Sequence, residues 1–457
     1  MTERPADELR DAAEHAGTGP AAEGPADPET GSGAVPGGNG GEALESRGSR
    51  GDEDGGDLRA EGTLRPRRSY LAGVVLRTFG RAGAVVGLAW LGVIAVFAVF
   101  GPWLASSHPY LWKVRTEDGS AAVSSPLVEH LGPADVTLLV LTLLVLPGLL
   151  VWRRASLGRR LGVLLLAAVV VGVSAWWFVQ PPATVVYDRY RAAERAGQVE
   201  WVLRPPIPFS PSDRQRDRPE AKNLAPSSTH WMGTTVDGED LASRMIHASR
   251  IALAVGFIAT GIAVVIGVLL GGLMGYFSGW IDLLGMRLLE IFEAIPQLYL
   301  LLTIVAFIQR GPYMLYLMMV IIGLTSWTGY ARFTRAEFLR LRRLDYITAA
   351  RASGLPLGSI LLRHMLPNGI APVLVSASFG VASAILLEAF LSFLGLGLVD
   401  EPSWGQMLSQ AVGAGGGFVW WIALYPGLAI FLTVFSYNLI GESLRDAIDP
   451  YTQKKAG

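Results

Sequence analysis

Three carboxylates within long apolar runs are the residues of this chain most able to do chemistry. Glu290 and Glu293 lie near the inner end of one run, and Glu388 lies towards the outer end of another. Ionisable groups are costly inside a membrane and usually mark a functional site. Glu290 and Glu293, with Arg287 in reach, could equally belong to a structural network in which the charges are paired. We treat the three carboxylates as candidates either for a polar path or for a polar core.

No catalytic constellation accompanies these carboxylates. The chain has no cysteine, which excludes thiolate metal sites and cysteine nucleophiles, and its six histidines form no HExxH pair. It also lacks the GxxxxGK[ST] loop that binds nucleotide phosphates. We therefore predict a protein that is not an enzyme, with no catalytic residue, no metal site and no cofactor of its own.

The composition indicates that membrane helices carry these residues. Of the 457 residues, 51% are hydrophobic and 17% are charged, whereas soluble domains have about a quarter charged. The net charge of -1 gives no reason to expect nucleic-acid binding. Eight apolar runs are long enough to cross the hydrocarbon of a bilayer, which needs about 20 helical residues. They lie at 82–105, 134–152, 161–179, 250–278, 284–309, 312–331, 368–396 and 418–441.

These runs predict an all-α polytopic bundle of about eight transmembrane helices in a lipid bilayer. The run at 134–152 is the weakest because Pro147 interrupts it, so a re-entrant or interfacial segment is the alternative there. Residues 1–69 have one valine and no Ile, Phe, Trp or Tyr, too little apolar surface to offset the entropy of ordering. They predict a disordered cytoplasmic tail.

Basic residues in short loops indicate the orientation, because they prefer the cytoplasm. Arginines gather at 65–81, at 153–160 and within 332–363, and two lysines lie near the C-terminus. Both termini are therefore predicted to be cytoplasmic. The long outer segment at 180–248 is rich in proline and charge and is expected to be ordered only in part. It is interpreted either as a surface for an extracytoplasmic partner or as a tether with surface helices.

The most distinctive polar segment is the cytoplasmic loop at 332–368. Residues 346–353 predict a helix, Gly354 and Pro356 end it, and residues 357–365 predict a second short helix. A short helix held crosswise at the membrane face would protrude and would suit a groove on a partner. An amphipathic helix lying on anionic lipid accounts equally well for the arginines. This lipid-surface interpretation does not explain the break between the two helical pieces.

This loop resembles the cytoplasmic EAA loop of ABC importer membrane subunits, specifically the C-type permease of the dipeptide, oligopeptide and nickel (Dpp/Opp) systems. The resemblance rests on Ala349-Ala350, Gly354 and the run from His364 to Asn368. Stretches at 230–296, 385–405 and 426–450 are also similar to the family, so the resemblance covers about 228–451 and the first span. Thr348, Thr235 and Glu239 depart from the family pattern.

The resemblance implies a six-helix type I importer core with an inserted helix pair. It divides the chain into a tail (1–69), an elbow and first helix (70–105), the inserted pair (106–180), an extracytoplasmic loop (181–248), the permease core (249–451) with its coupling loop at 332–367, and a short cytoplasmic tail (452–457). It also implies a set of ATPase-coupling residues. These are Tyr346, Ala349, Ala350, Gly354, Leu355, Pro356, His364, Pro367 and Asn368.

The implied function is that of a multi-pass permease subunit in a bacterial inner membrane. The protein would pair with a homologous B-type permease to form the path for peptides or related solutes. An extracytoplasmic solute-binding protein would deliver the solute, and two cytoplasmic ATPase subunits would bind the ATP. A glycine-rich face would allow close helix packing in this bundle or at the partner interface. It comprises Gly261, Gly267, Gly271, Gly272 and Gly275.

Two other classes of function stay open at this point. A membrane scaffold or sensor could have kept the permease core and used the added spans for another interaction. An ion-coupled carrier could use the three carboxylates, but the cytoplasmic loop carries the denser motif. The identity of the solute and the role of the inserted pair do not follow from the sequence.

Overall fold

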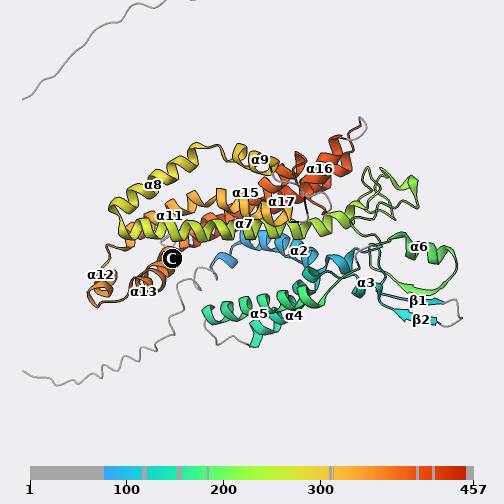
Figure 1. Ribbon diagram of the computed structural model, residues 1–457, viewed down its shortest axis with the longest axis horizontal. Helices are drawn as coiled ribbons and strands as arrows, with labels where there is room; N and C mark the ends of the chain where they lie inside the picture. Colours follow the sequence, from blue (N-terminus) through green and yellow to red (C-terminus); the bar gives the residue numbers. More distant parts are fainter. Residues whose placement is uncertain are drawn as a thin grey trace, which may run out of the picture. The chain divides into compact units, whose positions relative to one another are not determined.

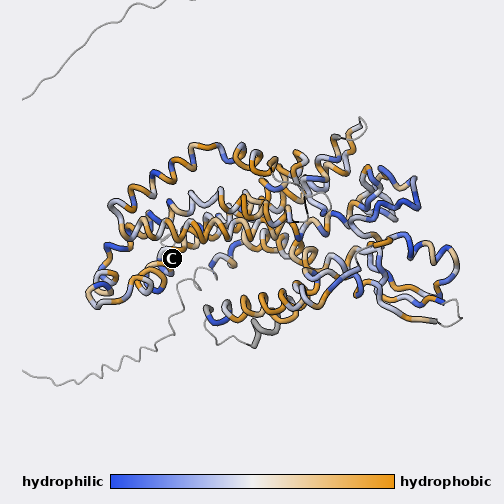
Figure 2. The backbone as a smooth tube through the Cα atoms, viewed as in Figure 1, coloured by the Kyte–Doolittle hydropathy of each residue, from blue (hydrophilic) through white to orange (hydrophobic). Residues whose placement is uncertain are grey.

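The computed structural model describes residues 77–115, 121–151, 157–182, 185–307, 311, 313–397, 401–413 and 417–448. All of them belong to one compact unit, residues 66–457. The predicted tails at 1–69 and 452–457 lie outside the described residues. Figure 2 shows apolar residues along the helices of this unit and hydrophilic residues gathered towards its two ends. This is the pattern expected of a bundle that crosses hydrocarbon.

Four helices are long and apolar enough to cross a membrane, and they lie side by side (Figure 1). They are α2 (Ala82–Leu104), α7 (Leu241–Phe277), α15 (Ala371–Phe393) and α17 (Trp420–Ile448). Within the described residues, the number of spans rises to six if two bent helix pairs are counted as one span each. The expected count of about eight is thus not reached by length and composition.

The first bent pair is α8 (Gly279–Ala294) with α9 (Gln297–Phe307), which meet at 73°. Pro296 lies at the break, and Ile295 before it is extended (φ -88°, ψ 119°) because proline excludes the helical conformation from the preceding residue. The second pair is α10 (Met314–Thr325) with α11 (Trp327–Leu341), which meet at 41°. Proline thus supplies a local reason for the sharper bend.

The inserted segment contains helices α4 (Pro133–Val151) and α5 (Leu157–Phe178). Their described apolar stretches, Pro133–Val145 and Gly162–Phe178, are shorter than a standard span. Arg250 of α7 joins this segment to the core, because its Nη1 donates to Asp135 Oδ1 at 2.6 Å and its Nε donates to the Ala98 carbonyl at 2.9 Å. The inserted pair is therefore attached to α2 and α7 by a half-buried ion pair.

A small antiparallel sheet outside the helices corrects the expectation of an all-α chain. Its strands are β1 (Leu111–Arg115), β2 (Ala121–Ser124) and β3 (Val199–Leu203), in the order β2-β1-β3. Trp112 faces inward, pairs in register with Ser124 and Val202, and packs edge-on against Tyr190 of α6 (Asp188–Arg195). Strands of four or five residues are too short for a search that looks for long apolar runs.

The outer segment is more ordered than its sequence predicts. The structure describes residues 185–240 throughout, including the short helix η1 (Pro219–Ala221). Earlier in the chain, the short helix α3 (Pro126–Glu129) packs against β1. Arg191 is buried and donates to Asp213 and Asp217 at 2.6 Å each. Burial alone would lower the pKa of Arg191, but these hydrogen bonds outweigh it and raise that pKa. The same bonds lower the pKa of Asp217 to about 2.

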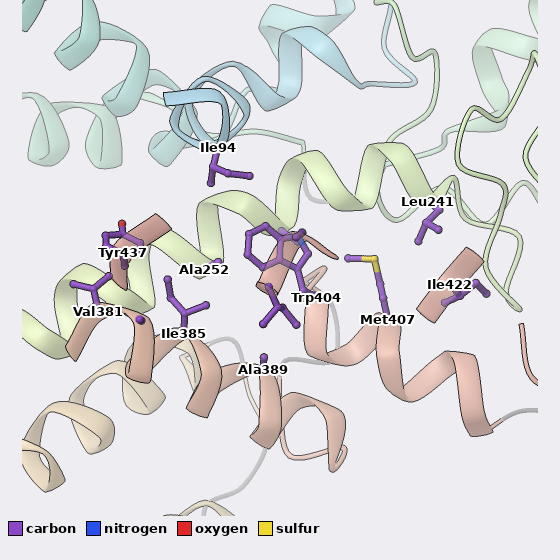
Figure 3. Packing of buried hydrophobic residues seen from close by; sticks show 14 of the residues in the cluster. Ile94, Leu241, Ala252, Val381, Ile385, Ala389, Trp404, Met407, Ile422 and Tyr437 are labelled. Carbon is purple, nitrogen blue, oxygen red and sulfur yellow. The ribbon is translucent and has the colours of Figure 1, made fainter. Parts of the chain in front are cut away.

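The main core lies where α2, α7, α15 and α17 meet the short outer helix α16 (Trp404–Gly413). Figure 3 shows Ile385 and Ala389 of α15 lying opposite Trp404 and Met407 of α16, with Ile94 of α2 on the far side of α7. Burying these apolar side chains stabilises the arrangement of the helices. The core thus holds α16 against the ends of the spanning helices that lie away from the loop at 332–368 (Figure 1).

Candidate functional site

The polar loop predicted at 332–368 forms a helical knob at one end of the unit (Figure 1). It consists of α12 (Asp345–Ala352), α13 (Leu357–Ser359), a π-helical turn (Ile360–Met365) and α14 (Leu366–Gly369). The two predicted helical pieces are present, but the second does not end at Pro367. The π turn places Pro367 in the first turn of α14, where no backbone N–H is needed.

Gly354 produces the break between the two pieces. Its φ is +70°, in the left-handed region that favours glycine. Its N–H donates to the Arg351 carbonyl at 3.0 Å, and the Leu355 N–H donates to the Ala350 carbonyl at 3.2 Å. This pair of bonds is a Schellman motif, which satisfies the last carbonyls of α12. A local rule of helix termination therefore fixes the direction in which the chain leaves α12.

The knob has an inward and an outward face. Ile347, Ile360 and Met365 are buried against Phe338 and Leu341 of α11. Ala350, predicted as a coupling residue, is also buried there, so it supports the knob from inside. The outward face carries the other predicted coupling residues of the first piece. They are Tyr346, Ala349, Gly354, Leu355 and Pro356, and all are exposed.

Exposed apolar side chains give the outward face its character. Leu355 is 38% exposed, and Tyr346 and Leu357 are similarly open. Apolar groups clustered on a surface of this kind mark an interaction site. No residue in the described ranges covers this face. The predicted residues His364 and Asn368 act within the knob, because His364 Nδ1 pairs with the Ser359 carbonyl and Asn368 donates to the His364 carbonyl at 2.7 Å.

Polar contacts tie the knob to the spanning helix α7. Arg342 Nη1 donates to the Tyr276 carbonyl at 3.1 Å, and the Arg351 guanidinium lies 4.6 Å above the centre of the Tyr276 ring. Next to them, Arg335 of α11 makes a bidentate ion pair with Asp282 of α8. These contacts connect the knob to α7, and they connect α11 to α8.

Glycines bring α7 and α11 into unusually close contact. A Cβ at Gly271 would lie 2.3 Å from the Ala331 carbonyl oxygen, and one at Gly275 would lie 2.7 Å from the Arg335 carbonyl oxygen. Gly267 and Gly272 likewise face Tyr330 and Phe338 of α11. Gly261 has open space around it. Four of the five predicted glycines thus serve packing within this chain.

A cavity of about 480 Å³ lies between α7, α10, α11 and α15. Its apolar walls carry several polar side chains: Thr260, Gln297, Thr325, Ser326, Ser376 and Ser383. Gln297 Nε2 lies 2.8 Å from Ser326 Oγ, so the break after α8 and the break after α10 meet here. The mixture of apolar walls and a few hydrogen-bonding groups suits a small polar solute.

Sequence reasoning missed this set of residues. The available signal was weak, namely Gln297 directly after Pro296 and the Thr325-Ser326 pair inside an apolar run. Both lie at points where a helix bends. Polar groups at helix breaks line cavities in membrane proteins, because the freed backbone needs partners.

The three candidate carboxylates do not come together in the structure. Glu290 pairs with Arg287 at 2.5 Å and Glu293 pairs with Arg332, and both carboxylates are exposed. Glu388 is 3% exposed and accepts hydrogen bonds from Ser392 and Ser403, each at 2.7 Å. None of the three lines the cavity at mid-bundle. The geometry therefore favours the interpretation as a satisfied polar network.

Comparisons with known proteins identify membrane components of transport systems. The family model described as "Binding-protein-dependent transport system inner membrane component" matches residues 267–454. A second, "N-terminal TM domain of oligopeptide transport permease C", matches residues 69–126. Residues 127–266, with the inserted helices and most of the outer segment, lie between the two matches.

Several curated proteins are similar over about half of this chain. The dipeptide transport system permease protein DppC of Alkalihalophilus pseudofirmus is 39% identical over 51% of this chain and 75% of its own length. The glutathione transport system permease protein GsiD of Pectobacterium atrosepticum is 38% identical over 50% and 75%. The oligopeptide transport system permease protein OppC of Haemophilus influenzae is 39% identical over 48% and 70%. A solved inward-facing structure of the MetNI methionine ABC transporter aligns with 19% identity and a TM-score of 0.36, over 46% of this chain and 98% of that one.

Proposed function

Because this chain belongs to the family of binding-protein-dependent transport permeases, as an OppC-type subunit of an ABC importer, we propose that it forms half of a translocation path for peptides. Membership of this family implies ATPase and binding-protein partners. The single observation that carries the mechanism is the knob, with an exposed apolar face on one side and a buried face packed on α11 on the other.

The proposed partners follow from the two ends of the molecule. A homologous B-type permease supplies the other half of the path. Two cytoplasmic ATPase subunits bind the ATP, and one of them receives the outward face of the knob in a groove. An extracytoplasmic solute-binding protein delivers the peptide at the opposite end. The arginines of the cytoplasmic loops support a multi-pass bacterial inner-membrane protein with both termini in the cytoplasm.

The proposed coupling is mechanical. Closure of the ATPases would displace the knob, whose buried face and Arg342 and Arg351 contacts connect it to α7 and α11. Those two helices form walls of the 480 Å³ cavity, so the displacement reaches the groups that face the solute. Thr260, Gln297 and Ser383 would offer hydrogen bonds to the peptide backbone there.

A charge placed on the outward face tests the coupling. We expect Leu355→Asp to reduce both the recovery of ATPase subunits with the purified permease and ATP-driven peptide uptake in proteoliposomes by about tenfold or more, because a buried interface anchor would become charged. Val123→Asp introduces a charge at an exposed valine of β2, at the far end of the unit (Figure 1), and should leave the recovery of ATPase subunits unchanged. Normal ATPase recovery and uptake in Leu355→Asp would refute the docking role.

A further inference from the structure

A second cavity, of about 520 Å³, lies at the outer end of the unit. The start of α6, the turns at 212–216 and 237–239, the first turn of α7 and the helix α16 form its walls. It is separate from the cavity at mid-bundle, since the two share no lining residue. Its size is within the range of small-molecule sites.

The walls of this outer cavity carry equal numbers of opposite charges. Four carboxylates and four guanidinium groups line it: Asp188, Asp213, Asp237, Glu239, Arg191, Arg214, Arg216 and Arg244. An anionic solute would meet four carboxylates, and a cationic solute would meet four guanidinium groups. An apolar solute would remove water from all eight without replacing its hydrogen bonds, which is costly. The charge pattern therefore favours a solute with one charge of each sign.

Buried ion pairs hold the back of the cavity rigid. Arg244 is 5% exposed, donates through Nη1 to Glu239, and donates through Nη2 to Gln406 Oε1 at 2.9 Å. Arg191 is held by Asp213 in the same way. These groups are already paired, so they shape the site without needing a solute. A rigid wall lowers the entropy cost of binding.

Three charged groups at the cavity make no hydrogen bond or ion pair with any residue that the structure describes: the Asp188 and Asp237 carboxylates and the Arg216 guanidinium. Asp237 is half-buried, whereas Asp188 and Arg216 are exposed. Asp237 is therefore the better shielded of the two carboxylates, and Arg216 is the one cavity-lining guanidinium without such a partner among the described residues. Asp237 and Arg216 suit the ammonium and the carboxylate of one molecule.

We propose that the outer cavity binds a short zwitterionic peptide, with its ammonium group at Asp237 and its terminal carboxylate at Arg216. The choice of a peptide among zwitterions rests on the proposed function. The site would hold the solute outside the membrane, next to α16 and the outer end of α7, before it reaches the cavity at mid-bundle.

Calorimetric titration of trialanine into the full-length permease in lipid nanodiscs, without ATP, tests this site. We expect saturable binding that weakens about tenfold or more in Asp237→Asn and in Arg216→Gln, because each loses a charge-assisted hydrogen bond. N-acetyl-trialanine amide carries neither terminal charge. It should bind the unaltered protein at least as weakly as trialanine binds the two variants. Glu220→Gln and Arg189→Gln change exposed charges outside the cavity and should keep the original affinity.

Three results would overturn the inference: no saturable binding, equal binding of the blocked peptide, or unchanged affinity in both cavity variants. We expect both variants to fold, because neither Asp237 nor Arg216 makes a hydrogen bond or ion pair with a described residue, and melting temperatures would verify this. ATP-driven uptake by the assembled transporter is measured separately. Uptake without outer binding overturns only this site, whereas outer binding without uptake overturns the proposed transport of peptides.

Discussion

At the residue scale, Gly354 is the position where local backbone geometry meets the proposed coupling. Its φ of +70° is strained for other residues, and a Cβ there would meet open space. Strain therefore comes from the backbone and not from a clash. A β-branched residue in the left-handed region costs roughly 1–2 kcal/mol, while asparagine tolerates it better.

We predict that Gly354→Val lowers ATP-driven uptake several-fold while the amount of protein in the membrane stays unchanged, because the direction of the chain after α12 would shift. Gly354→Asn should keep most of the uptake. Gly358→Ala, in the next helix with similarly open surroundings, serves as the matched control. Uptake assays with quantified membrane protein would measure this, and full uptake in the valine variant would contradict it.

Substitutions of Glu388 can distinguish a structural role of this carboxylate from a role in ion-coupled transport. Its Oε1 accepts two serine hydroxyls, one of them from Ser403 at the start of α16. Glu388→Gln keeps an acceptor oxygen, so we predict near-normal uptake and thermal stability. Glu388→Ala leaves two buried hydroxyls without an acceptor and should cost about 1–3 kcal/mol of stability, measured as a lower inactivation temperature. Loss of uptake in the glutamine variant at normal stability would instead support a proton-carrying role.

At the scale of elements, the close contact between α7 and α11 is the packing on which the proposed coupling depends. Gly271 and Gly261 lie on the same helix but differ in surroundings, since only Gly271 faces the backbone of α11. We predict that Gly271→Ala destabilises the protein by about 1–3 kcal/mol through overpacking. Gly261→Ala should be neutral or slightly stabilising. Thermal inactivation of the two variants measures the difference, and equal temperatures would show that the helices separate easily.

At the scale of the whole molecule, His108 is a buried histidine in the loop before β1 that packs against residues 187–190, and the proposed transport mechanism does not use it. His108 stacks on His130 with ring centres 4.0 Å apart, beside Tyr187 and Tyr190, and Asp213 is the carboxylate that acts on it. Burial, followed by the repulsion of His130, lowers the pKa of His108 from 6.5 to about 4. Between pH 6.5 and pH 4, His108 is therefore mostly protonated in the unfolded chain and mostly neutral in the folded protein.

This difference in proton uptake makes acid destabilising. The contribution of a neutral His108 is complete above pH 6.5 and is lost as the pH falls towards 4, so we predict that the region around His108 loses about 2 kcal/mol of stability between pH 7 and pH 5. Amide hydrogen exchange of β1 at the two pH values measures it. His108→Asn should reduce the pH dependence. An unchanged dependence in that variant would assign it to another group.

The local parts of this protein could be predicted from its sequence. Apolar runs identify the helices because hydrocarbon demands internal hydrogen bonding over about 20 residues. The break at Gly354 follows from the backbone freedom of glycine, and the bend at 295–297 follows from proline. The motifs around the knob were enough to indicate the family, since they lie within one continuous segment.

Only the tertiary structure decided which distant residues meet. Arg250 of α7 pairs with Asp135 of α4, and the Ser403 hydroxyl donates a hydrogen bond to Glu388 of α15. The short sheet, the buried ion pairs of the outer segment and both cavities arise in the same way. Their partners lie tens to more than a hundred residues apart in the sequence, and no local periodicity records such a pairing. The physical reason is that polar groups leaving water require whichever partner the packed helices bring near, and packing is a property of the whole fold.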